Sequence, residues 1–220
     1  MLETVRSALL LLIVVTPALL AGQANTTSPE ALARALQDRY RSVRDFSGEF
    51  TQTYRGAALR TRTVESGTVT IKQPGKMRWI YTKPERKEVV SNGSKSYLYI
   101  PADKQVIESK VPTDDRASTP ALFLAGKGDV ARDFTVSLSA TTTPGTVALK
   151  LTPRRNEPDY EYFVLVVDPN TLRVTSLTTR DRQGGEWSLT FSKLKENQGI
   201  SDKEFEFRIP RGVDVVTTDD

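Results

Sequence analysis

Polar and apolar residues alternate along most of this chain, from Phe46 to about residue 195, and this alternation constrains the fold more than any other feature. A period of two residues is typical of β-strands with one buried and one wet face. The pattern predicts strands at residues 46–54, 63–73, 76–82, 87–92, 95–100, 104–111, 132–139, 145–151, 159–168, 171–180 and 186–195. Most links between them are short turns such as Asn92-Gly93, which cannot hold a crossover helix. We therefore expect successive strands to pair antiparallel in a long meander.

A sheet of this many strands must curl or close, because strand twist accumulates across it. One face then becomes an inner face that carries the large apolar side chains. The alternation predicts the inner residues Phe46, Phe50, Val69, Ile71, Met77, Trp79, Tyr81, Tyr97, Tyr99, Phe134, Val136, Leu138, Val147, Leu149, Leu151, Val164, Val166, Trp187, Leu189 and Phe191. For each of these residues alone, ordinary core packing is the alternative to a binding role.

A helix precedes the first strand. Ser28 followed by Pro29 is typical of an N-cap and a first helical residue. The apolar residues that then repeat at helical spacing are Leu32, Leu36, Tyr40 and Val43. We expect an amphipathic helix of about four turns that covers the sheet as a lid.

A second, shorter helix is predicted between the sixth and seventh strands. Thr119 caps it, Pro120 begins it and Gly126 ends it. Its three consecutive large apolar residues are Leu122, Phe123 and Leu124. A helix of under two turns cannot place all three on one stripe, so we expect it to lie over an apolar concavity as a movable plug.

Residues 1–24 have the pattern of a secretory signal peptide. Arg6 precedes an apolar run at 8–21, and small residues end at Ala24. A transmembrane anchor is the alternative, but this run is shorter than the roughly 20 residues that cross a bilayer. We expect residues 25–220 to be a single, soluble, exported domain, which is periplasmic if the organism has two membranes.

Histidine and cysteine are both absent from the sequence. Their absence excludes Ser-His-Asp and Cys-His catalysis, zinc or haem sites built from His or Cys, and disulfides. The formal charge is +4, and the 31 Lys and Arg residues are scattered, so nucleic acid is not an expected partner. Asp114-Asp115 and the pair Glu157 and Asp159 lack the spacing of a calcium loop. We predict a binding protein that is not an enzyme and has no cofactor or metal.

Several segments, taken in their order and spacing, resemble the LolA family of periplasmic outer-membrane lipoprotein carriers. They are residues 46–52 (FSGEFTQ), 67–81 (GTVTIKQPGKMRWIY), 90–93 (VSNG), 97–101 (YLYIP), 119–124 (TPALFL), 181–184 (DRQG) and 205–216 (FEFRIPRGVDVV). No single segment is specific, because Pro-Gly-Lys and Asn-Gly turns are common. Their combination covers nearly all of the chain after the signal peptide.

The resemblance implies an α+β, mainly β fold: a half-open antiparallel β-barrel of about eleven strands, covered by the N-terminal helix and short lid helices, around an apolar cavity. Such a monomeric carrier receives the acyl chains of lipoproteins from an inner-membrane ABC transporter and delivers them to an outer-membrane lipoprotein receptor. The residues that we assign to lipid binding are Phe50, Val69, Ile71, Met77, Trp79, Tyr81, Tyr97, Tyr99, Leu122, Phe123, Leu124, Phe134, Leu149 and Leu189.

Cargo like that of the family brings about three acyl chains, or some 45 methylene groups. At about 0.8 kcal/mol each, full burial contributes roughly 36 kcal/mol, well above the roughly 18 to 21 kcal/mol at which affinity saturates. Cargo held so tightly is not handed on. The cavity therefore covers the chains incompletely or loses free energy on opening, and we predict that packing of Leu122, Phe123 and Leu124 in the empty cavity supplies that loss.

Gln73 departs from the family pattern. Members similar to the type case have an arginine at this position, immediately before the proline that begins the Trp strand, and it resembles a latch that holds the closed lid. Glutamine keeps a donor and an acceptor but lacks the charge and the five-donor fork. A latch at Gln73 would therefore be weaker.

Other functions remain open for the same fold. One is a binding module for another lipid or a glycolipid, and another is a periplasmic sensor or regulatory domain. The outer-membrane receptor that accepts the lipoprotein resembles this fold but is usually anchored by a lipidated cysteine, so the absence of cysteine favours the carrier.

A candidate surface for binding an acidic receptor contains Arg60, Arg62, Lys83, Arg86 and Lys87. A solvated rim is the alternative for these residues.

Overall fold

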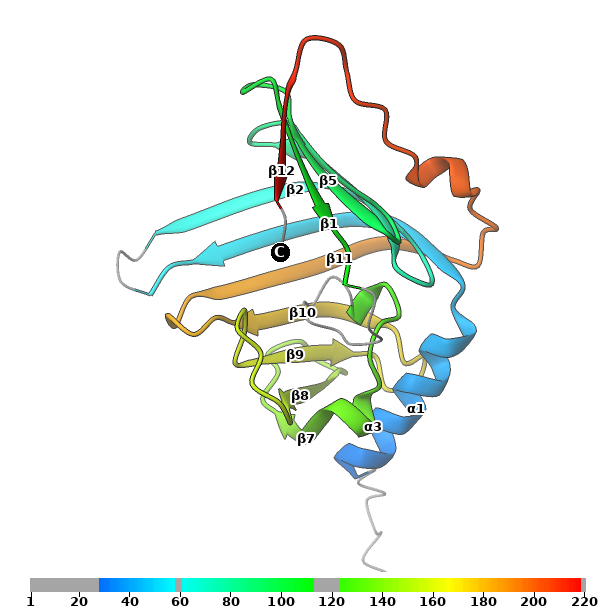
Figure 1. The fold of residues 1–220 in the computed structure, drawn as a ribbon. Helices are drawn as coiled ribbons and strands as arrows, with labels where there is room; N and C mark the ends of the chain where they lie inside the picture. Colours follow the sequence, from blue (N-terminus) through cyan, green and yellow to red (C-terminus); the bar gives the residue numbers. More distant parts are fainter. Residues whose placement is uncertain (1–27, 58–60, 113–122, 219–220) are drawn as a thin grey trace, which may run out of the picture.

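A computed structural model describes residues 28–57, 61–112 and 123–218 (Figure 1). The predicted signal peptide lies outside these residues, as do Leu122, the start of the predicted short helix and Asp114-Asp115. The described chain forms one 12-stranded sheet with helices α1 (Pro29–Ser42), α3 (Val130–Asp133) and the 3₁₀ helix η1 (Asp202–Phe205). The mainly β, N-terminally helical architecture predicted from the sequence is confirmed.

Eleven of the strands lie at the predicted positions, to within a few residues at their ends. The strands are β1 (Asp45–Arg55), β2 (Arg62–Lys72), β3 (Lys76–Lys83), β4 (Lys87–Asn92), β5 (Lys95–Ile100), β6 (Gln105–Lys110), β7 (Phe134–Ser139), β8 (Val147–Pro153), β9 (Tyr162–Val167), β10 (Val174–Arg180), β11 (Glu186–Glu196) and β12 (Asp214–Thr218). Strand β12 is the one not predicted. All five of its residues are exposed, so no alternation of burial marks it.

The strand order is β12-β6-β5-β4-β3-β2-β1-β11-β10-β9-β8-β7, which is two meanders joined where β1 pairs antiparallel with β11. The single long meander predicted from the sequence is therefore wrong at one link, because β6 and β7 lie on opposite halves of the sheet. The chain between these strands is long enough to cross from one half to the other. Strand β12 adds to β6 in parallel, and β12 and β7 end the sheet, which stays open as expected for a half-open barrel.

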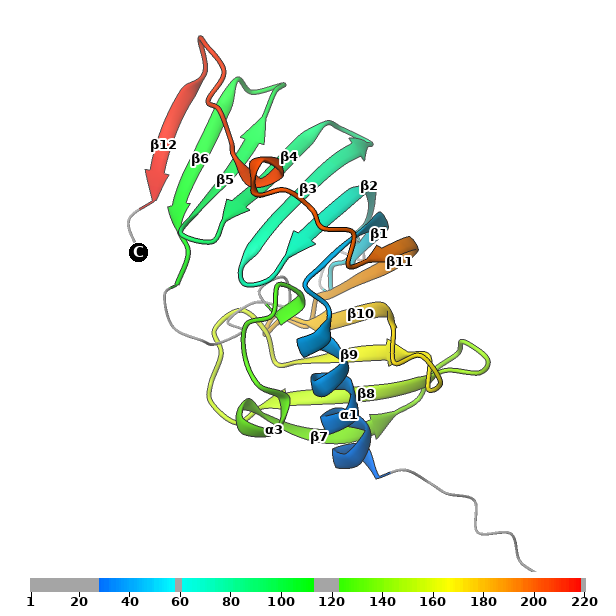
Figure 2. The ribbon, with the colours of Figure 1, turned by 90° about the vertical axis from the view of Figure 1, so that its right-hand side faces the viewer.

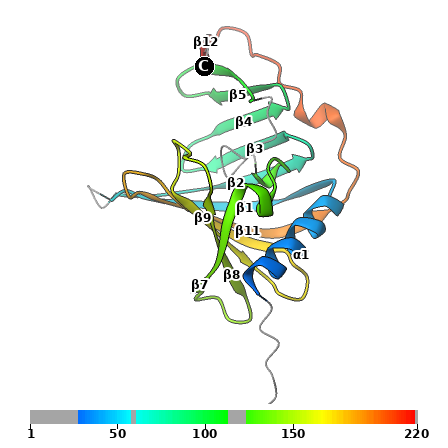
Figure 3. The same cartoon turned by 60° about the horizontal axis from the view of Figure 1, so that its bottom comes forward.

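Helix α1 covers the β7–β10 half of the sheet (Figure 2). The Ser28 side chain accepts a hydrogen bond from the Ala31 N–H at 3.1 Å, which is the predicted N-cap. Leu32 and Leu36 are buried against the inner face of the sheet. Figure 3 shows the helix crossing in front of the curled sheet, as a lid would.

The inner face of the sheet carries the main core, to which α1 and residues 123–125 also contribute. Its members from the strands are Phe46, Phe50, Val69, Ile71, Met77, Trp79, Tyr81, Phe134, Leu149, Leu151, Phe163, Leu165, Val167, Val174, Leu177 and Phe191. Most of the predicted inner residues are among them. Leu138 is 53% exposed although it shares this face, because β7 is the edge strand of the sheet.

Tyr97 and Tyr99 lie on the outer face, so their prediction as inner residues is wrong. In the strand register both alternate with Leu98, which pairs with the inward Val89. The Tyr97 ring stacks on Phe207 of the C-terminal segment, with ring centroids 5.1 Å apart. The sequence could not distinguish the faces here, because residues 97–100 are large and apolar in every position.

Strand β9 contains the same ambiguity. Val164 and Val166 were predicted to face inward, but Phe163, Leu165 and Val167 are the fully buried residues and the two valines are half-buried on the other face. Five of the six residues of β9 are apolar in succession after Tyr162. Alternation cannot be read from such a run.

The segment between β11 and β12 is held on the outer face by charged side chains. The carboxylate of Asp202 accepts from Lys72 Nζ at 2.7 Å and from Lys76 Nζ at 2.8 Å. Arg78 donates to the backbone carbonyls of Glu204 and Glu206. These contacts place Phe205 over an outer cluster that includes Val90 and Val106, all three at most 1% exposed.

Asp202→Asn is expected to remove a pH-dependent part of the stability. Hydrogen bonds from Lys72 and Lys76 lower the pKa of Asp202 from 3.8 to about 2. Because its pKa is lower in the folded state, Asp202 stabilises the fold above about pH 4, and the contribution is lost as the pH falls through about 2. The difference in thermal midpoint between the wild type and the variant should be small at pH 5, smaller in high salt, mostly lost at pH 2 and absent near about pH 1. A difference that stays constant over this range would contradict the assignment.

Candidate functional site

Three aromatic rings form the centre of the inner face. Phe50 of β1 meets Trp79 and Tyr81 of β3 edge to face, with ring centroids 5.0 and 4.9 Å apart. Strand β2 lies between β1 and β3, and Gly67 is the residue that pairs with both Phe50 and Tyr81. Since glycine has no side chain, the rings on either side can meet above it.

Most residues predicted to bind lipid lie together on this inner face. Phe50, Val69, Ile71, Met77, Trp79, Tyr81, Phe123, Leu124, Phe134 and Leu149 belong to the core cluster, and Leu189 is half-buried against it. Tyr97 and Tyr99 are separated from them by the sheet itself. Leu122 lies outside the described residues.

The end of the predicted short helix lies inside the concave face. Residues 123–126, here called the lid turn, form the described end of this helix; Gly126 has φ +83° and donates its N–H to the Phe123 carbonyl at 3.0 Å. Leu124 is 1% exposed. The Phe123 ring packs against Phe163 at 5.2 Å and Phe134 at 6.3 Å between centroids. The lid turn thus occupies apolar space on the inner face of the sheet.

In the part of the chain that the structure describes, one backbone hydrogen bond and side-chain packing hold the lid turn to the sheet. The Gly75 N–H, in the turn between β2 and β3, donates to the Ala125 carbonyl at 2.9 Å. The Gln73 side chain packs on Gly126, where an added Cβ would approach it to 2.6 Å. However, its amide donates to the Tyr40 carbonyl of α1 at 3.4 Å and not to the lid turn. A neutral bond of this length is weak.

Gln73→Ala is therefore expected to change lid opening by no more than about threefold, because it removes one long, neutral hydrogen bond. The rate at which the protein takes up a fluorescent fatty acid measures this. Gln37→Ala is a matched control, since the Gln37 side chain accepts from the Val130 N–H at 2.9 Å and connects α1 to α3 instead of the lid turn. A change of tenfold or more for Gln73→Ala alone would show a latch.

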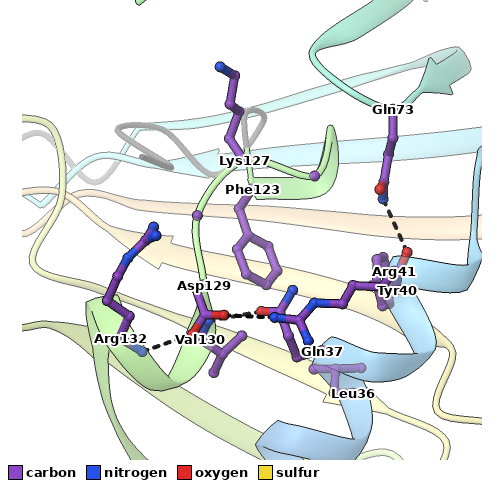
Figure 4. Close-up of a pocket in the computed structure, with 12 residues that line it drawn as sticks. Leu36, Gln37, Tyr40, Arg41, Gln73, Phe123, Lys127, Asp129, Val130 and Arg132 are labelled. Atoms are coloured by element: carbon purple, nitrogen blue, oxygen red, sulfur yellow. Dashed lines mark hydrogen bonds and ion pairs between the residues drawn. The ribbon is translucent and has the colours of Figure 1, made fainter. Parts of the chain in front are cut away.

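A pocket of about 290 Å³ separates α1 from the lid turn and the start of α3. Leu36, Phe123 and Val130 line its apolar side (Figure 4). The remainder is polar, and Arg41 closes it through an ion pair with Asp129 at 3.0 Å. This pocket lies between α1 and the lid turn, beside the apolar core that contains Phe123 and Leu124.

A polar row crosses the inner face beside the aromatic centre. The Gln52 amide donates to Glu65 Oε2 at 3.0 Å and accepts from the Tyr81 hydroxyl at 3.2 Å. Lys87 Nζ donates to Glu65 Oε1 at 2.6 Å and lies 4.3 Å from the Tyr81 ring centroid. Burial, and secondarily Glu65, raises the pKa of Tyr81, so its hydroxyl remains a donor at neutral pH.

This row was not predicted from the sequence, and the prediction that Lys87 lies on a receptor-facing rim is wrong, because its ammonium group contacts Glu65 on the inner face. The signal was present in the alternation, since Gln52 follows Phe50 by two residues and must share its face.

Among the described helices none is long and apolar enough to cross a membrane. The described residues also hold no cluster of acidic side chains that could bind a metal ion.

The chain is similar to proteins of one known family. A model of the outer membrane lipoprotein carrier protein LolA matches residues 41–208. An outer-membrane lipoprotein carrier protein of Methylococcus capsulatus is 32% identical over 195 residues, which cover 89% of this chain and 90% of the relative. Its counterpart in Chromohalobacter salexigens is 33% identical over 199 residues, 90% of each chain. A crystal structure of a conserved protein from Thermus thermophilus is similar in fold, with a TM-score of 0.53 at 15% identity over 84% of this chain and 99% of that one.

Proposed function

The chain belongs to the LolA family of outer-membrane lipoprotein carriers, and from this we propose that its inner face takes up the acyl chains of its lipoprotein cargo. It is a periplasmic transport protein that performs no catalysis. The proposed acyl-binding residues on the inner face are Phe50, Val69, Ile71, Met77, Trp79, Tyr81, Phe134, Leu149 and Leu189. Phe123 and Leu124 of the lid turn belong to the same surface.

The observation that carries this proposal is the burial of Phe123 and Leu124 among those residues. Acyl chains that enter the inner face must displace both side chains, which lose their contacts. Loading therefore costs free energy that offsets part of the roughly 36 kcal/mol available from burying about 45 methylene groups. A carrier of this design binds cargo reversibly, because the net free energy of binding is the gain from burying the acyl chains minus the cost of displacing the lid turn.

The same proposal includes the two proteins that supply the lipoprotein to this carrier and remove it. An inner-membrane ABC transporter supplies the lipoprotein, and an outer-membrane lipoprotein receptor removes it. Lys83 and Arg86 are exposed at the turn between β3 and β4 and suit an acidic receptor surface. Lys87 belongs instead to the polar row on the inner face.

Mass spectrometry of the protein purified from its own periplasm tests the proposed function. We expect acylated lipoproteins to copurify, and to be lost from a variant in which Trp79 is replaced by aspartate. The Asp variant of Ile209, which is 45% exposed between η1 and β12, is a control for a charge added outside the inner face. A glycolipid or another lipid as the bound species would favour a binding module of the same fold. If nothing acylated is recovered, the proposal is wrong.

A further inference from the structure

The polar row of Gln52, Glu65, Tyr81 and Lys87 crosses the apolar inner face at one position along the strands. On one side of it, along β1 and β3, lie Phe50 and Trp79 of the core. On the other side Tyr54 and Trp187 share the same face, with ring centroids 4.9 Å apart, and Trp187 is 40% exposed. Along its strands the inner face thus changes from a dry apolar part, through the polar row, to exposed aromatic rings.

This order of surfaces matches the order of groups in an acylated lipid. Hydrocarbon chains need the dry part, the carbonyl groups that join the chains to the head need hydrogen-bond donors, and the head itself meets water. Tyrosine and tryptophan at the wet end are typical of positions where one end of a ring is apolar and the other hydrated. A row needed for stability alone would not have to lie between these two zones.

The row also retains donors for a ligand. Lys87 Nζ carries three N–H groups, and its contacts are the hydrogen bond to Glu65 Oε1 and the approach to the Tyr81 ring. At least one N–H group is therefore available to a carbonyl oxygen. The Lys87 side chain is 29% exposed and that of Glu65 is 17% exposed, so a ligand on the inner face can reach them while the surroundings remain largely dry.

We propose that this row, through Lys87, binds the ester and amide carbonyl groups that join the acyl chains to the head of the cargo. The inference rests on the proposed function, since it needs acyl chains on the inner face. It adds a polar recognition element to apolar burial and sets how far the chains enter. Glu65 and Gln52 act as positioning residues, because they hold the Lys87 ammonium group and the Tyr81 hydroxyl in place.

Two short-chain lipids that differ only in their linkage test the proposal. Dioctanoylglycerol has two ester carbonyls, and dioctylglycerol has ether oxygens in their place. Their affinities are measured by displacement of a fluorescent fatty acid from the wild type and from Lys87→Met. The decisive quantity is the change between proteins in the ratio of the two affinities, because the difference in hydration of the free lipids cancels. We expect Lys87→Met to lower the ester-to-ether ratio about tenfold while the affinity for the ether changes little.

Two further variants separate recognition from structure. Lys87→Arg keeps the donors and should restore most of the ester preference. Lys95→Met removes a comparable ion pair, 2.5 Å from Lys95 Nζ to Glu108 Oε1 on the outer face, and should leave the ratio unchanged. An unchanged ratio in Lys87→Met, or an equal loss of both affinities, would overturn the inference and leave the carrier function intact. If the wild type binds neither lipid, both proposals fail.

Discussion

Leu124→Ala is expected to speed the uptake of a fluorescent fatty acid roughly 30-fold or more. Leu124 is 1% exposed in the core, and truncating such a leucine costs about 2 to 5 kcal/mol. The loss applies only while the lid turn is packed on the inner face, so it raises the population of the open form. Since about 1.4 kcal/mol is a factor of ten, even the lower value shifts the equilibrium about 30-fold. Stopped-flow fluorescence measures the uptake, and release into vesicles measures the reverse step.

Val106→Ala is the matched control for this effect. Val106 is fully buried, but in the outer cluster on the other face of the sheet. Its truncation should lower the free energy of unfolding by about 1 kcal/mol or more without changing uptake. Equal uptake rates in Leu124→Ala and the wild type would show that the lid turn is not displaced by ligand.

Asp45→Ala is expected to lower the free energy of unfolding by about 3 kcal/mol or more. Asp45 is 3% exposed at the start of β1, and its carboxylate accepts the backbone N–H groups of Gln198, Gly199 and Ile200 at 2.7, 3.1 and 3.2 Å. Hydrogen bonds to a charged group contribute about 1.5 to 3 kcal/mol each, and the alanine variant leaves these donors without their acceptor. Urea denaturation measures the loss.

The same variant should release the start of the C-terminal segment, which Asp45 joins to β1. Limited proteolysis after residue 196 is then expected to precede global unfolding. Asp38→Ala is the control, because Asp38 lies on the exposed face of α1 and, among the residues that the structure describes, pairs only with Arg41, which is also exposed. That substitution should change stability by less than about 0.5 kcal/mol. Similar losses in both variants would contradict the role of Asp45.

The strands were predictable where one face of the sheet is wet. In β3, Met77, Trp79 and Tyr81 alternate with Lys76 and Arg78, so the pattern specifies both the strand and its inner face. In β5 and β9 apolar residues occur on both faces, and the inner residues were assigned wrongly. For β5 the reason is the C-terminal segment, which covers the outer face with Phe207 and makes it a second apolar environment.

Most apolar residues of the candidate site could be predicted from the sequence, but the way in which the site is arranged could not. The apolar residues of the inner face and of the lid turn could be named from alternation and from three consecutive large side chains. The polar row was missed because alternation can place a residue such as Gln52 on the inner face but does not show that side chains of β1, β2, β3 and β4 meet there. The Gln73 side chain packs on Gly126 of the lid turn, while its hydrogen bond goes to α1.

The sequence by itself determined the antiparallel strands, the capped N-terminal helix and the exclusion of catalysis and metal sites that need histidine or cysteine. These follow from local rules: alternation, short turns, an N-cap, and the absence of histidine and cysteine. Only the tertiary structure decided that β1 pairs with β11, that the C-terminal segment covers the outer face, and that Glu65 meets Lys87 on the inner face. Those contacts join residues far apart along the chain or on separate strands, and their free energy depends on which surfaces are covered together, which no local pattern records.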